Sequence, residues 1–308
     1  MMFDFYIQYE YWFAAAQLAL AMFGMGATLR VRDFAAVVRN PWPITVGTVL
    51  QIAGVPLLAL LFLTVFPLDP GVAIGLALCA AIPGGTMSNV FTFLGRGHVA
   101  LSIALTGVTT VACLVTTPIV LGLLIEQYIP AEFSMPAGQV ALEIALILLL
   151  PLTLGMIFLV FLPAFAPGVS KVCIRSSLFI ILLIVIGATG SGRVDLEKFG
   201  LYNLGVVLLF LFFLATMSWL IPWLARVRRP DNTAINIEVT VRNGNLGLLI
   251  KASLFPALAG TADPVGDNVL FTVLIYGGAA LLVGFGQIYM HRHLNKNIPL
   301  SYSDITGR

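Results

Sequence analysis

The sequence is dominated by long stretches that contain almost no charged side chain. A run of about 20 apolar residues, wound as a helix, spans the hydrocarbon core of a bilayer. The composition agrees, because 59% of the 308 residues are hydrophobic and only 10% are charged, against about 25% in soluble domains. Hydropathy predicts nine spans, with approximate limits 11–29, 43–66, 71–95, 98–125, 137–162, 173–190, 199–225, 233–257 and 268–290.

These spans predict an all-α membrane protein. Short polar links such as "PLDPG" and "VRRPDN" leave no room for a soluble domain, so we expect residues 1–308 to form one integral membrane domain. The net charge of +2 is too small to indicate a nucleic-acid partner. Cys79, Cys113 and Cys173 lie in or beside apolar runs without metal-ligand spacing, and we expect them to be packing residues.

The distribution of Lys and Arg predicts how the chain lies across the membrane, because short cytoplasmic loops are enriched in these residues. If the N-terminus is outside, the cytoplasmic segments hold twelve of the sixteen basic residues: Arg30, Arg32, Arg39, Arg96, Lys171, Arg175, Arg226, Arg228, Arg229, Arg292, Lys296 and Arg308. The outer loops hold only Arg193 and Lys198. We therefore expect a multi-pass protein of the cell (inner) membrane with an outer N-terminus and a cytoplasmic C-terminus.

Two of the predicted spans are interrupted. The third contains "AIPGGTMSNV", where Pro83, Gly84 and Gly85 cannot sustain a helix, and the eighth contains "VRNGNLG". The breaks are five spans apart, so the two helices enter the membrane from opposite sides. A pair of interrupted spans at corresponding places in two inverted halves indicates the midplane site of a transporter.

Polar side chains gather around the two breaks. Hydroxyl and amide oxygens with one carboxylate are suitable ligands for a small alkali cation that has shed its water. The residues that we expect to form such a sodium site are Ser88, Asn89, Ser102, Thr106 and Glu238. Glu143 and Lys251 instead lie near predicted span ends, and we expect them to extend to the membrane surface.

The same segments resemble the bile acid:sodium symporter family. The similarity runs from "AMFGMGATLRVRDF" through "QIAGVP" and "IPGGTMSNVFTFLGRGHVALSIALT" to "NIEVTVRNGNLG", in the order and spacing of that family. The resemblance implies a panel domain and a core domain built from inverted repeats, with two discontinuous helices that cross near the midplane. It implies a first repeat that lacks one helix, as in the nine-helix vertebrate members. The first repeat would lie at about 11–126 and the second at about 137–291. The panel helices would lie within about 11–66 and 137–225, and the core helices within about 71–125 and 199–290.

The functional residues of the family can be carried over by position. Its first sodium site corresponds to the five residues named above, and its substrate contacts correspond to Thr86 and Asn243. Its second sodium site corresponds to Gln51, Glu238 and the backbone carbonyls of Val239 and Val241. At one further ligand of that second site the family has a glutamine, whereas this chain has Arg242. A fixed cation there would repel sodium by about 4 kcal/mol at a separation of about 4 Å.

Three roles for Arg242 are open. The guanidinium is a tethered cation in place of the second sodium, which we favour, or a clamp for the carboxylate of the substrate, or the partner of Glu238 in an ion pair. The resemblance implies sodium-coupled symport of an organic anion by alternating access. The substrate would be a bile-acid-like molecule or a small carboxylate such as pantoate or a keto acid. The alternative is a sodium-independent or proton-coupled organic anion carrier, because Arg242 replaces a sodium ligand.

Other classes of protein are less expected. A related class of arsenite efflux carriers uses a membrane cysteine beside the crossover, where this chain has Pro-Gly-Gly-Thr. An enzyme is not expected, because His98, His291 and His293 fall at cytoplasmic ends, where we expect solvated loop residues. The expected partners are sodium, the substrate anion and the lipid bilayer, and no obligate protein partner is evident.

Overall fold

The computed structural model of the protein describes residues 2–30, 41–128, 136–257 and 263–296, and within these ranges the chain is helical without β-strands. The all-α prediction is therefore confirmed for this part of the chain. Arg32, Arg39 and Arg308, which enter the prediction of orientation, lie outside the described residues.

Six helices of the described residues are long and apolar enough to cross a membrane. Four of them are built on α7 (Val99–Ile125), α10 (Ala166–Gly190), α12 (Leu201–Leu224) and α15 (Pro264–Leu294), of which α7 ends in the short turn η2 (Glu126–Tyr128). The other two each contain a π-helical stretch. One consists of α3 (Pro41–Val49), η1 (Leu50–Gly54) and α4 (Val55–Val65), and the other of α8 (Ala137–Glu143), η3 (Ile144–Leu149) and α9 (Leu150–Phe161).

The other predicted spans contain α1 (Met2–Gly26) and two pairs of short helices, so the count of nine membrane spans stays a prediction. The third predicted span is divided into α5 (Pro70–Ala81) and α6 (Thr86–Leu94). The eighth is divided into α13 (Arg229–Thr240) and α14 (Gly244–Leu254). A single turn, α11 (Leu196–Phe199), precedes α12.

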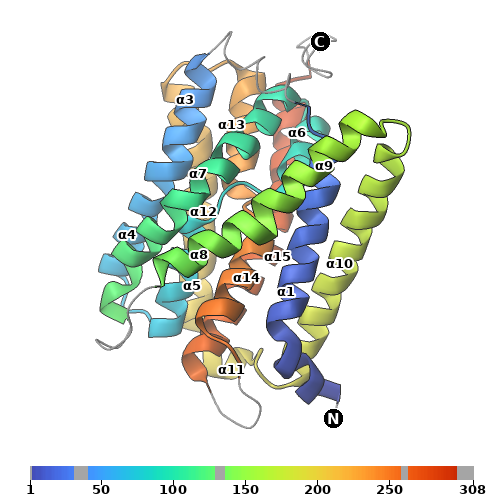
Figure 1. The fold of residues 1–308 in the computed structure, drawn as a ribbon. Coiled ribbons are helices and arrows are strands. Elements are labelled where there is room, and N and C mark those ends of the chain that lie inside the picture. Colours follow the sequence, from blue (N-terminus) through green and yellow to red (C-terminus); the bar gives the residue numbers. More distant parts are fainter. Residues whose placement is uncertain (1, 31–40, 129–135, 258–262, 297–308) are drawn as a thin grey trace.

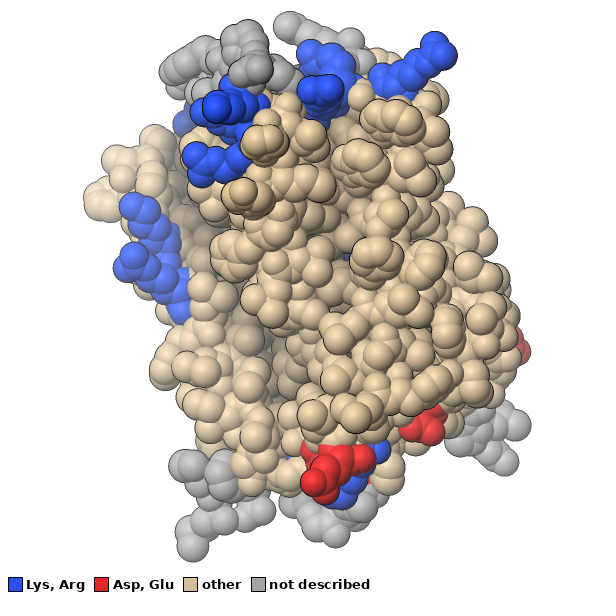
Figure 2. Space-filling model, turned by 180° about the vertical axis from the view of Figure 1, so that it is seen from behind, with Lys and Arg blue, Asp and Glu red and all other residues tan. Residues whose placement is uncertain are grey.

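The helices form one bundle, with two flanks that are easily distinguished in Figure 1. On one flank α1 packs against α10, and α9 crosses α1 obliquely. On the other flank lie α3 and α4, followed by α7. Of the short helices, α5, α13 and α14 are mostly buried, whereas α6 keeps one exposed face; α5 packs against α15 and α13 against α12. Figure 2 shows that Lys and Arg gather mainly at one end of the molecule on the face drawn, and Asp and Glu at the other.

The two breaks are held together by their own backbone groups. Gly84 and Arg242 form an isolated antiparallel β-bridge. The Gly85 amide donates to the Val241 carbonyl at 2.9 Å, and the Asn243 amide donates to the Pro83 carbonyl at 2.9 Å. Backbone groups that have left a helix at membrane depth need such partners, because the hydrocarbon offers none. The interrupted spans therefore cross where their helices stop.

The expectation that Lys251 and Glu143 extend to the membrane surface is wrong. Lys251 is fully buried, and its ammonium donates to the Glu10 carboxylate of α1 at 2.9 and 3.0 Å. Glu143 is 9% exposed and accepts hydrogen bonds from Ser253 at 2.7 Å and Gln139 at 3.2 Å. Each side chain stays inside because it has a polar partner there, and a buried charge is tolerated where it is paired.

The expectation that His291 lies in a solvated loop is also wrong, because the residue is buried. Helix α15 continues to Leu294, and the His291 ring is 2% exposed. Its Nδ1 lies 3.0 Å from the Thr233 hydroxyl, and its Nε2 lies 2.8 Å from Oδ1 of Asn236. The ring thus joins α15 to α13 by hydrogen bonds inside the bundle.

The link before α13 is fixed by a buried carboxylate. Asp231 is 1% exposed and accepts from His98 at 2.6 Å and from Nε of Arg228 at 2.8 Å. The His98 amide also donates to the Pro230 carbonyl at 2.9 Å. Burial alone would raise the pKa of Asp231, but the hydrogen bonds from His98 and Arg228 outweigh it and hold the pKa below its ordinary value. Ionised Asp231 therefore stabilises the junction of α7 with α13.

We predict that Asp231→Asn lowers the stability of the fold at pH 7 by about 2 kcal/mol, because it removes hydrogen bonds to a buried charge. A carboxyl whose pKa is lowered by folding stabilises the protein above the ordinary pKa of aspartate, about 3.9, and loses that contribution as the pH falls through its folded value. In detergent, the unfolding temperature of the variant should thus lie below that of the wild type, and the difference should become smaller below pH 4. The exposed-site control Glu197→Gln should change little at either pH.

Candidate functional site

The site is centred on the carboxylate of Glu238, which is fully buried in α13. The Ser102 hydroxyl donates to its Oε2 at 3.0 Å and the Thr106 hydroxyl to its Oε1 at 2.5 Å, both from α7. Ser88 of α6 also donates to Oε2. Oδ1 of Asn89, on the next residue of α6, lies 3.5 Å from the Thr106 hydroxyl. The structure therefore brings together all five residues of the first predicted site.

The break in the third span makes room for this carboxylate. A Cβ atom at Gly84 would overlap the Glu238 carboxyl group, so the position requires a residue without a side chain. Directly after the break, the Ser88 hydroxyl oxygen also lies 2.5 Å from the Gly85 carbonyl oxygen, so its one proton is shared between that carbonyl and the Glu238 carboxylate. The break and the polar residues that follow it thus act as one unit.

The donor set suits a small cation. Three hydroxyl oxygens contact a single, fully buried carboxylate, and one amide oxygen lies next to the Thr106 hydroxyl. A hydroxyl that donates its proton to the carboxylate keeps lone pairs for a cation. An unneutralised carboxylate would be costly at this depth, whereas a bound cation would compensate its charge.

Arg242 does not pair with this carboxylate in the described residues, where the ion pairs include none between Arg242 and Glu238. Its Nη2 instead donates to the carbonyls of Ala80, at 3.2 Å, and Ile82. These carbonyls belong to the last turn and the C-cap of α5. A helix C-terminus carries partial negative charge and favours a cation. The guanidinium therefore occupies a position where the backbone alone attracts positive charge.

In the second predicted site, several of the expected ligand oxygens already accept hydrogen bonds from the protein. Gln51 of η1 is 2% exposed and lines, together with Arg242, a small cavity of about 10 Å³. The Val241 carbonyl accepts the Gly85 amide, and the Glu238 carboxylate accepts from α6 and α7. Val239 is buried within α13. The Arg242 guanidinium and Gln51 thus line the same small cavity.

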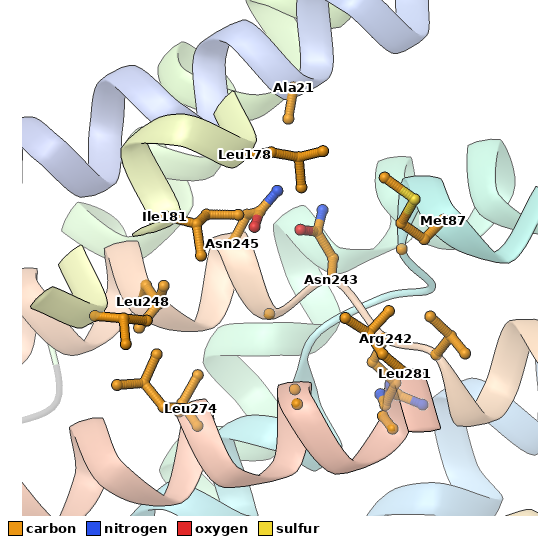
Figure 3. Close-up of a pocket in the computed structure, with 18 of the residues that line it drawn as sticks. Ala21, Met87, Leu178, Ile181, Arg242, Asn243, Asn245, Leu248, Leu274 and Leu281 are labelled. Carbon is orange, nitrogen blue, oxygen red and sulfur yellow. The ribbon is translucent and has the colours of Figure 1, made fainter. Parts of the chain in front are cut away.

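A larger cavity of about 420 Å³ lies beside the crossing, between α1 and α10 on one side and α14 and α15 on the other. The first residues of α6 and α14, Thr86 and Gly244, line it, and so does Asn243. Figure 3 shows the amides of Asn243 and Asn245 directed toward α10, while the Arg242 side chain runs the opposite way. Most of the remaining wall is apolar, with Leu178, Ile181, Leu248, Leu274 and Leu281 among its residues.

Two residues near this cavity were not assigned from the sequence. Asn245 lines the cavity and belongs to the first turn of α14. Gln17 of α1 is fully buried, and its Nε2 donates to the Asn245 carbonyl at 3.1 Å, which fixes α1 to the start of α14. A lone amide within an otherwise apolar span was the available signal for Gln17, since such residues in membrane helices usually form interhelical hydrogen bonds.

Comparison with known proteins agrees with the family resemblance seen in the sequence. The model of the Sodium Bile acid symporter family matches residues 15–196, which include the first broken span and α7. A Bacillus subtilis protein described as an uncharacterized sodium-dependent transporter, YocS, is 32% identical over 80% of this chain and 76% of its own length. A probable chloroplastic sodium/metabolite cotransporter, BASS2, of Oryza sativa subsp. japonica is 29% identical over 86% of this chain and 62% of its own.

A sodium-dependent organic anion transporter of Bos taurus is 29% identical over 92% of this chain and 74% of its own length. All three relatives are named as transporters rather than enzymes. The family match covers well over half of the chain, and the relatives extend it across most of the length. The chain therefore belongs to the sodium bile acid symporter family.

Proposed function

We propose that this protein is a secondary active transporter that carries an organic anion together with sodium by alternating access. The observation that carries the proposal is the buried Glu238 carboxylate, held by three hydroxyl groups where two broken helices cross, beside a cavity of about 420 Å³. Such crossings are where sodium-coupled carriers bind their ions and substrates. The printed names of the relatives, which include sodium-dependent transporters, support the same function.

In this proposal sodium is transported, and it binds to Ser88, Asn89, Ser102, Thr106 and Glu238. Hydroxyl, amide and carboxylate oxygens from α6, α7 and α13 converge there. Because the ligands belong to three different helices, a bound ion would fix the crossing in one arrangement. That property allows sodium to control the access of the substrate.

The substrate of this proposal is an organic anion with an apolar body. Helix N-termini attract anions, and those of α6 and α14 both meet the cavity. Thr86 and Asn243 would contact the anionic group, and the leucine-lined wall would contact the remainder. The volume of about 420 Å³ falls in the usual range of small-molecule sites, about 300–1,000 Å³. A bile-acid-like molecule or a small carboxylate such as pantoate or a keto acid has this chemistry.

The proposal includes the family architecture. The paired breaks of α5–α6 and α13–α14 would be the crossing of two inverted repeats, in a core domain that moves against a panel containing α1, α9 and α10. We place the N-terminus outside in the cell (inner) membrane. The gathering of Lys and Arg at one end of the molecule supports this orientation, because cytoplasmic segments are enriched in these residues.

We further propose that Arg242 is a tethered cation that replaces the second sodium. Its Nη2 donates to two carbonyls at the end of α5, and its side chain runs away from Asn243 and Asn245. These contacts favour a tethered cation over a clamp for the substrate. With one fixed positive charge in the site, each monovalent anion needs only one sodium ion, so the transported species together carry no net charge.

We predict that Thr106→Val raises the sodium concentration for half-maximal transport about tenfold or more, since it removes a hydrogen bond to the buried charge of Glu238. The matched control is Thr109→Val, one turn along α7. Thr109 is also buried and donates to a backbone carbonyl, but it has no hydrogen bond to Glu238. Sodium-dependent uptake into proteoliposomes is the measurement. Equal effects of the two variants, or uptake by the wild type without sodium, would contradict the assignment and favour the proton-coupled or sodium-independent alternative.

We predict that Arg242→Gln makes transport electrogenic, because a second sodium ion then takes the place of the guanidinium. A membrane potential contributes about 2.3 kcal/mol per charge per 100 mV. An imposed inside-negative potential should therefore increase accumulation by the variant and leave the wild type unchanged. Arg242→Lys keeps the charge and should behave like the wild type. Loss of substrate binding at every sodium concentration in Arg242→Gln would instead favour the substrate clamp.

A further inference from the structure

A second group of charged residues lies away from the crossing and has no role in the function proposed above. Arg193, in the link after α10, donates from Nη1 to Glu10 of α1 at 2.9 Å and from Nε to Asp267 of α15 at 2.5 Å. Glu10 also accepts from Lys251 of α14 at 2.9 Å. We call these four residues the end network. It contains two acidic and two basic residues, so its formal charges balance.

The end network is buried for a set of charges. Lys251 is 0%, Glu10 5% and Arg193 8% exposed, and only the Asp267 side chain, at 26%, is substantially open. Burial alone would lower the pKa of Arg193, but Glu10 and Asp267 raise it above its ordinary value. The Arg193 guanidinium therefore stays charged, and its contacts with Glu10 and Asp267 are ionic hydrogen bonds. Glu10 is the hub, since it contacts both cations.

The end network lies at one end of the 420 Å³ cavity. Val194, the neighbour of Arg193, lines the cavity, and so does Phe271, one helical turn after Asp267. Leu248, three residues before Lys251 in α14, lines it as well. Figure 1 shows the first residues of α1 and the α11 turn at this same end of the bundle. The end network therefore lies next to the cavity, on the side of the N-terminus.

The end network also joins the two walls of the cavity. Glu10 belongs to α1 and Arg193 to the link that follows α10, whereas Lys251 and Asp267 belong to α14 and α15. Removing one partner from a buried ion pair is costly, which favours the closed arrangement. If the walls separate and water enters, however, all four groups regain hydration, which offsets the lost pairing. Buried ion pairs can therefore hold the two walls together and still separate when water reaches them.

We propose that the end network is the outer gate of the cavity, closed in this structure and broken whenever the cavity opens to the outside. The gate rests on the alternating access proposed above and on the outer position of the N-terminus. Its strength sets how often the protein faces outward without substrate. Weakening it shifts the population toward the outward-open form without altering the crossing at Glu238.

The gate is tested by labelling a cysteine in the cavity with a maleimide that does not cross membranes. The reporter is Ile181→Cys in a Cys173→Ser background, in which Cys79 and Cys113 are buried. With Glu10→Gln, labelling from the outer face should accelerate about tenfold, whereas the exposed-site control Glu197→Gln should leave it unchanged. Labelling of the Glu10→Gln protein at the parent rate, or acceleration only from the cytoplasmic face, would overturn the gate.

A second variant decides the question even if Glu10→Gln fails to fold. Arg193→His with Asp267→His places two zinc ligands across the same contact. Zinc should slow the outer labelling of the Ile181→Cys reporter, and EDTA should restore the fast rate. Unchanged labelling in zinc would overturn the gate. Labelling requires neither sodium nor substrate to move, so a protein that labels as expected but transports nothing would contradict the proposed function and leave the gate intact.

Discussion

The structure depends on how unpaired backbone groups are satisfied at membrane depth. Each broken span leaves amides and carbonyls without helical partners, and the hydrocarbon cannot supply them. Here the two breaks form hydrogen bonds with each other: the Gly85 amide donates to the Val241 carbonyl, and the Asn243 amide donates to the Pro83 carbonyl. Neither break would be stable alone, so the third and eighth predicted spans must meet where they stop. The rest of the site follows from that contact.

The meeting of the breaks determines where charge can be held. Gly84 leaves space for the Glu238 carboxylate, which then faces the hydroxyls of α6 and α7. The end of α5 holds the Arg242 guanidinium by its carbonyls. The site therefore holds one acidic and one basic side chain, Glu238 and Arg242, that do not pair directly in the described residues.

Much of this arrangement could be predicted from the sequence, because the signals were local. Pro83, Gly84 and Gly85 cannot continue a helix, and apolar runs of span length indicate membrane helices directly. The burial of Lys251 could not be predicted in this way, because its partner Glu10 lies 241 residues away and nothing in the sequence pairs them. The direction of Arg242 was equally hidden, since it depends on the carbonyls at the end of α5 rather than on its neighbours in sequence.

We propose that the crossing at Glu238 binds one sodium ion and that Arg242 takes the place of a second. Equilibrium binding of radioactive sodium to the purified protein tests both parts at once, without any need to know the organic substrate. We expect one sodium ion per chain in the wild type and none in Glu238→Gln. Binding that survives Glu238→Gln would contradict the site, and two sodium ions per wild-type chain would contradict the role of Arg242.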